Sequence, residues 1–63
     1  MKIIQVDNFD RDNVPDILIA ENVHPEFIEE IVEFLNKKYS GNNSPDYYRA
    51  VEDDYKLKKI QLP

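Results

Sequence analysis

The chain has 63 residues, with no cysteine, one histidine, one glycine and four prolines, and a formal net charge of -5. This length allows a single domain, residues 1–63, and the lack of cysteine excludes a disulfide framework, a thiolate metal site and a nucleophilic thiol. A chain this short buries only about 60% of its unfolded surface. We therefore expect a partner chain to add stability, in the simplest case as a homodimer.

Charge and hydropathy favour an intracellular protein with an acidic surface. Residues 1–36 carry nine acids and two bases, whereas residues 37–63 carry six bases and four acids. The longest apolar run, Ile17–Ala20, is far too short to span a membrane, and the N-terminus lacks the features of a signal peptide. We expect a cytoplasmic protein that does not interact with membranes.

Two strands are predicted in the first third of the chain. Lys2–Val6 is rich in β-branched residues, and the turn-forming residues 7–13 end it. Asp16–Glu21 is predicted to form a second strand, with apolar residues on both faces as expected of a covered or central strand. A loop of this length most simply joins the two as an antiparallel pair.

A helix is predicted from Pro25 to about Tyr39. Proline suits the first helical position, His24 is the candidate N-cap, and Gly41 is placed to end the helix in a left-handed conformation. Apolar residues recur at helical spacing and predict a face that packs against the sheet. They are Phe27, Ile28, Ile31, Val32, Phe34, Leu35 and Tyr39.

The last third of the chain allows two interpretations. Tyr47–Val51 and Tyr55–Ile60 flank Glu52–Asp54 and predict a hairpin, which gives an α+β fold with one amphipathic helix on a small antiparallel sheet in the order β-β-α-β-β. Alternatively, Ser44 and Pro45 begin a second helix, which gives the order β-β-α-α.

Three short motifs, AENV, LNKKYSG and YYRAVEDDYKL, lie within residues 16–57. They resemble motifs of a loose group of small uncharacterised proteins of phages and other bacterial mobile elements. The resemblance implies an accessory role and a strand–turn–strand structure for the last motif. It implies no activity and no site residues.

Two groups of residues are candidate binding surfaces. The first is a carboxylate face on the helix, where residues four apart share a side: Glu26, Glu29, Glu30 and Glu33. This face is typical of a solvated surface, with an ion pair expected between Glu33 and Lys37, or of a surface for a basic partner. The second group is Tyr47, Tyr48, Arg49 and Tyr55, which with nearby lysines could stack and neutralise a nucleic acid. The net charge of -5 argues against strong nucleic-acid binding.

Catalytic and metal chemistry are not expected. His24 lacks an evident nucleophile or orienting carboxylate, the carboxylate face lacks histidine partners at helical spacing, and the acidic loop after Val6 lacks the glycine and spacing of a calcium loop. We therefore predict no enzyme activity, metal or cofactor. The function predicted is an acidic interaction protein that binds an unidentified protein, with weak nucleic-acid binding as the alternative.

Overall fold

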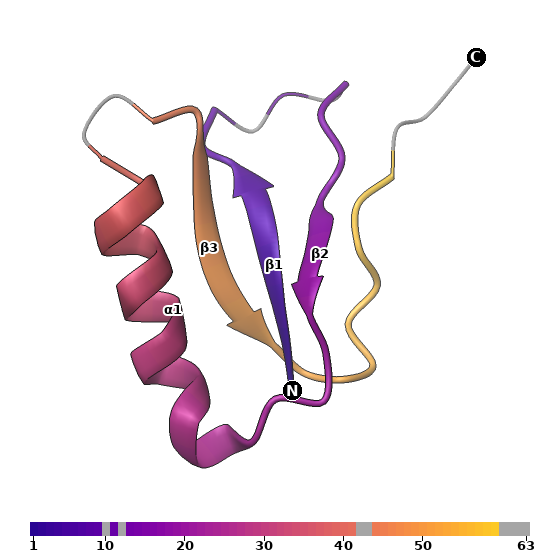
Figure 1. The fold of residues 1–63 in the computed structure, drawn as a ribbon. Coiled ribbons are helices and arrows are strands. Elements are labelled where there is room, and N and C mark those ends of the chain that lie inside the picture. Colours follow the sequence, from indigo (N-terminus) through magenta and orange to yellow (C-terminus); the bar gives the residue numbers. More distant parts are fainter. Residues whose placement is uncertain (10, 12, 42–43, 60–63) are drawn as a thin grey trace.

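The computed structural model describes residues 1–9, 11, 13–41 and 44–59, and all structural statements below concern these residues. It contains a helix and a three-stranded antiparallel sheet, as Figure 1 shows. In chain order the elements are β1 (Lys2–Asp7), β2 (Ile17–Ala20), α1 (Pro25–Tyr39) and β3 (Asp46–Val51). The α+β prediction is confirmed at this level.

Strand β1 is the centre of the sheet, whose order is β2-β1-β3. The pairing of β1 with β3 is regular from Lys2↔Val51 to Asp7↔Asp46, whereas the pairing with β2 shifts register between Ile3 and Ile4. Neighbouring side chains on a strand point to opposite faces, yet Ile3 and Ile4 are both 0% exposed. Both faces of the sheet are therefore covered at its centre.

The helix has the predicted bounds because its start is encoded locally. The Nδ1 of His24 accepts a hydrogen bond from the Glu26 N–H at 3.0 Å, and Pro25 occupies the first helical turn. The helix ends without the predicted left-handed glycine, because Gly41 does not have a positive φ. Instead the Ser40 N–H donates to the Asn36 carbonyl at 2.9 Å, and the Ser44 hydroxyl donates to the Tyr39 carbonyl at 3.3 Å.

Helix α1 packs against the sheet along β3 and not over its centre. In Figure 1 it lies beside β3, on the side away from β1. The Asn36 side chain bonds both the N–H and the carbonyl of Tyr48, and the Ser40 hydroxyl donates to the Asp46 carbonyl at 2.8 Å. The helix thus covers part of the open edge of the sheet.

The expected fourth strand is not present over residues 55–59, and Ile60 lies outside the described residues. After a turn at Glu52, the chain leaves β3 and runs beside β2, as Figure 1 shows. There Asp16 and Lys58 exchange hydrogen bonds: the Asp16 N–H donates to the Lys58 carbonyl at 2.9 Å, and the Lys58 N–H donates to the Asp16 carboxylate at 2.8 Å. The alternative of a second helix is wrong, because Asp46–Val51 forms β3.

The buried core is small. Among the described residues it consists of Ile3, Ile4, Ile28 and Val51. The predicted apolar face of the helix is wider than the face it buries, since Phe27 is 53% and Phe34 is 59% exposed. The helix is too far towards the sheet edge to bury these two aromatic rings.

Candidate functional site: a groove between the helix and the edge of β3

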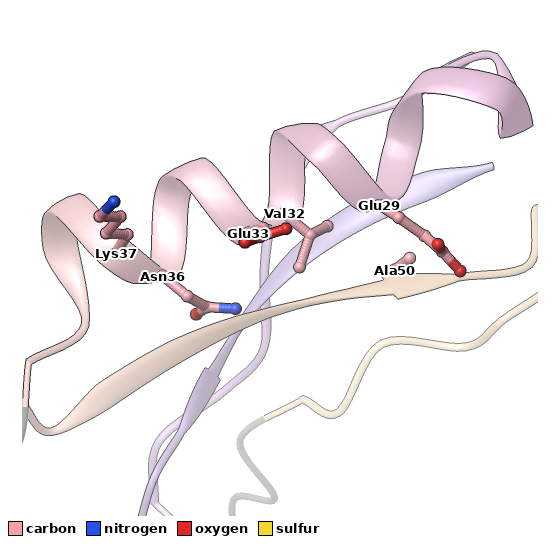
Figure 2. Close-up of a pocket in the computed structure, with 6 residues that line it drawn as sticks. All are labelled: Glu29, Val32, Glu33, Asn36, Lys37 and Ala50. Atoms are coloured by element: carbon pink, nitrogen blue, oxygen red, sulfur yellow. The ribbon is translucent and has the colours of Figure 1, made fainter.

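An open groove of about 720 Å³ runs between α1 and β3, as Figure 2 shows. The helix supplies five of its lining residues and β3 supplies one. They are Glu29, Val32, Glu33, Asn36, Lys37 and Ala50. The groove is the place where an acidic helix face meets the sheet edge.

Helical spacing accounts for the helix side of the groove. Residues three and four apart are neighbours on a helix surface, so Glu29, Glu33 and Lys37 form one row and Val32 and Asn36 form the next. The side chains of Glu29 and Glu33 are exposed, and the side chain of Val32 between them is half-buried. In Figure 2 the Glu29 side chain extends towards Ala50. The groove therefore has an apolar floor and a carboxylate rim.

The strand side of the groove is an edge whose backbone groups alternate in direction. In an antiparallel strand the N–H and carbonyl of one residue point to the same side, and the next residue points to the other side. The Tyr48 N–H and carbonyl both bond Asn36, at 2.7 and 2.9 Å, so they point away from β1. Since the pairing of β3 with β1 is regular, the N–H and carbonyl of Ala50 point to the same open edge.

The outward backbone groups of β3 are only partly satisfied within the chain. The Asn36 side chain hydrogen-bonds the outward N–H and carbonyl of Tyr48. The Asp46 carbonyl accepts hydrogen bonds from the hydroxyls of Ser40 and Ser44. Within the described part of the chain, no side chain or loop backbone bonds the outward groups of Ala50. The edge is thus covered at one end and open at the groove.

The two carboxylates of the groove carry no ion pair among the described residues. The ion pairs found there join Arg11 to Asp7 and the N-terminal ammonium to Asp53. The expected pair between Glu33 and Lys37 is not formed. The groove therefore carries two carboxylates and the Lys37 ammonium, and none of these groups is joined in an ion pair among the described residues.

The four predicted glutamates do not form one site. Glu29 and Glu33 line the groove, whereas Glu26 and Glu30 are exposed elsewhere on the helix. Helical spacing predicts two pairs, Glu26 with Glu30 and Glu29 with Glu33. It cannot indicate which pair faces the sheet edge. That depends on how the helix is rotated against β3.

The predicted tyrosine surface is divided between the two faces of the sheet. Tyr47 and Arg49 share one face, whereas Tyr48 points to the other, where its ring meets the edge of the Tyr39 ring at 6.4 Å. The Arg49 guanidinium lies over the Tyr55 ring at 5.5 Å from its centroid. Three of the four residues, Tyr47, Arg49 and Tyr55, can therefore act together.

The groove residues that the sequence did not indicate as site residues are Val32, Asn36, Lys37 and Ala50. Asn36 carried a usable signal, because it is a polar residue next to the apolar helix positions Val32 and Leu35. A polar side chain at such a position needs hydrogen-bond partners when it is buried. Nothing in the sequence marks Ala50, whose role comes from its backbone.

The buried carboxylate of Asp7 has a structural role. It accepts hydrogen bonds from the backbone N–H and the guanidinium of Arg11, at 2.7 to 3.0 Å. The hydrogen bond from the Arg11 side chain is the main reason that the pKa of Asp7 lies well below its usual range. Asp10 and Asp12 lie outside the described residues, so the structure does not place the rest of this loop.

No group of three or more His, Asp or Glu side chains among the described residues is arranged to hold a metal ion. No helix in the described ranges combines the length and the apolar character needed to cross a bilayer.

Comparisons with known proteins add no further assignment. The chain matches no protein-family model, no curated protein and no solved structure. The resemblance to phage and mobile-element proteins therefore stays a prediction from the sequence.

Proposed function

We propose that this chain is a small protein-interaction module that binds a protein partner at the α1–β3 groove. The observation that carries the proposal is the position of Glu29 and Glu33, whose carboxylates form no ion pair among the described residues. They line, together with Lys37, a groove floored by Val32 and Ala50. Apolar contact supplies affinity, and charge complementarity selects a partner and speeds association. The matching surface on the partner carries basic and apolar side chains.

Several properties of the proposal come from the sequence alone. They are a cytoplasmic location, an accessory role in a phage or another mobile element, and the absence of catalysis. A shallow groove beside one strand edge supports binding more readily than catalysis, because an active site needs several convergent polar groups in a concave pocket.

Charge reversal on one side of the helix tests this function. The variant Glu29→Lys/Glu33→Lys changes the groove, and Glu26→Lys/Glu30→Lys changes the net charge equally outside it. Each variant serves as bait in quantitative affinity capture from the cells that produce the protein. We expect the groove variant to lose the proteins that the wild type and the matched control both retain. Equal capture by both variants, or no specific capture by the wild type, contradicts the proposal.

The alternative function is weak nucleic-acid binding through Tyr47, Arg49 and Tyr55. The observation in its favour is the stacked Arg49–Tyr55 pair on the face that Tyr47 shares, because aromatic rings and arginine planes are surfaces on which bases stack. Titration with single-stranded DNA at low and moderate salt tests this alternative. Binding that weakens with salt and is lost in Tyr55→Ala supports it, and no binding at micromolar protein refutes it.

A further inference from the structure

We propose that the partner enters the groove as an extended basic segment, which adds a short strand to the open edge of β3 at Ala50. This inference rests on the proposed function and specifies how the same site recognises its partner. Strand addition uses main-chain hydrogen bonds for affinity and alternate side chains for specificity. The β3 side of this groove offers main-chain hydrogen-bonding groups, and the α1 side offers side chains that can select a partner.

The backbone part of the argument concerns which edge groups are free. Asn36 and the two serines satisfy the outward groups of Tyr48 and the Asp46 carbonyl, so no strand can pair there without displacing them. The outward N–H and carbonyl of Ala50 follow two residues later, where the groove is open. An added strand therefore pairs at Ala50 alone, because β3 ends at Val51 and the Glu52 carbonyl already accepts from the Tyr55 N–H at 3.0 Å.

The side-chain part of the argument concerns charge and spacing. In an added strand every second side chain points to the helix side of the edge. Glu29 and Glu33 are four residues apart on α1, which places their Cβ atoms about 5–6 Å from each other. A single arginine or lysine can thus meet both carboxylates, and Arg can do so through its planar fork. Val32, beside them, accepts the apolar part of that side chain.

A synthetic peptide of alternating valine and arginine, about six residues long with blocked ends, is a suitable probe. A matched peptide carries glutamate in place of arginine. Binding is followed by the backbone amide signals of the labelled protein and by hydrogen exchange at Ala50. We expect the arginine peptide alone to bind, with slowed exchange of the Ala50 amide. We also expect at least tenfold weaker binding in Glu29→Gln/Glu33→Gln and little change in Glu26→Gln/Glu30→Gln.

Backbone N-methylation of the peptide tests strand addition without altering the protein. Methylation at the nitrogen that donates to the Ala50 carbonyl removes one hydrogen bond and should weaken binding about five- to tenfold. Methylation at the neighbouring nitrogens, which point away, should have little effect. A flat methylation profile, or signal changes centred on Phe27 and Phe34, overturns the inference.

Three further outcomes separate the inference from the function on which it rests. If partner capture depends on Glu29 and Glu33 but the methylation profile is flat, the interaction function stands and strand addition is wrong. If Ala50 becomes protected as the protein alone is concentrated, the occupant is a second copy of the chain, and the inference of a basic partner is wrong. If the groove variants capture the same proteins as the wild type, the proposed interaction function is wrong.

Discussion

Removal of the Asn36 side chain should cost this protein a large part of its stability. Asn36 acts as a substitute for a neighbouring strand, since its Nδ2 donates to the Tyr48 carbonyl at 2.9 Å and its Oδ1 accepts from the Tyr48 N–H at 2.7 Å. Each of these hydrogen bonds contributes about 1 kcal/mol net. Alanine has a better helix propensity than asparagine by roughly 0.5 kcal/mol. Asn36→Ala should therefore lower the free energy of unfolding by about 1.5 kcal/mol.

The measurement is urea unfolding followed by far-UV circular dichroism. The total stability expected of a chain this size is about 3–9 kcal/mol, so the effect is a substantial fraction of it. The midpoint of thermal unfolding should fall by about 6–12 °C. Glu30→Ala is the matched control, because Glu30 is exposed on the same helix, and it should change stability by less than about 0.5 kcal/mol.

The variant Asn36→Asp adds a test that depends on pH. The introduced carboxylate still accepts from the Tyr48 N–H but opposes the Tyr48 carbonyl, whereas the protonated carboxyl can donate to it. Folding should raise the pKa of the introduced group, so its stabilising contribution is present at low pH and is lost as the pH rises through that pKa. The explanation is refuted if Asn36→Ala costs no more than Glu30→Ala.

Three other predictions concern the backbone, the core and the buried carboxylate. Asn22 has a φ of 59°, a left-handed conformation that costs less for glycine than for alanine. In urea unfolding, Asn22→Ala should therefore lower the free energy of unfolding by about 1 kcal/mol, and Asn22→Gly should not. Ile28 is 2% exposed, and Ile28→Ala should cost about 2–5 kcal/mol by the same method; a loss below 1 kcal/mol would show that the helix is not seated as described. Because Arg11 lowers the pKa of Asp7, the carboxylate stabilises the fold above the ordinary pKa of about 4, and this stabilisation is lost as the pH falls through the lower folded pKa. Acid unfolding of Asp7→Asn should lack this part of the pH dependence, and an unchanged acid profile would contradict the assignment.

The helix and the first two strands could be predicted because their signals are local. The N-cap at His24 and the proline after it specify where α1 begins, and the β-branched residues of β1 match its central position. The predicted stop at Gly41 was wrong in its conformation. The chain satisfies the last helix carbonyls through Ser40 and Ser44 instead, and these contacts depend on how the following loop folds back.

The fourth strand was not predictable from local pattern, because a hairpin and the helix compete for the same edge. An arm returning from Val51 would have to pair with the outward groups of β3 at Tyr48, which Asn36 already bonds. The chain therefore continues beyond the turn and bonds Asp16 near β2. Alternating apolar and lysine residues at 55–60 fit either path equally well. Only the position of the helix decides between them.

The candidate site was predictable in its chemistry but not in its geometry. The sequence predicts either a solvated face or a surface for a basic partner at the four glutamates. Which of the four line the groove, Glu29 and Glu33, follows from the rotation of α1 against β3. The contribution of Ala50 is invisible in the sequence because it comes from the direction of its N–H and carbonyl, which the register with β1 sets.

The carboxylate rim has two physical consequences that support each other. An open strand edge is prone to pair with the same edge of another copy, and natural proteins oppose this by placing charges beside it. If two copies paired through β3, Glu29 and Glu33 of each would approach the same residues of the other, and the like charges would repel. The same charges attract an incoming segment that carries arginine or lysine. Specificity then arises from repulsion of the wrong occupant as much as from attraction of the right one. Neutralising Glu29 and Glu33 should therefore weaken the binding of the basic partner. The same change should remove an electrostatic barrier to self-association.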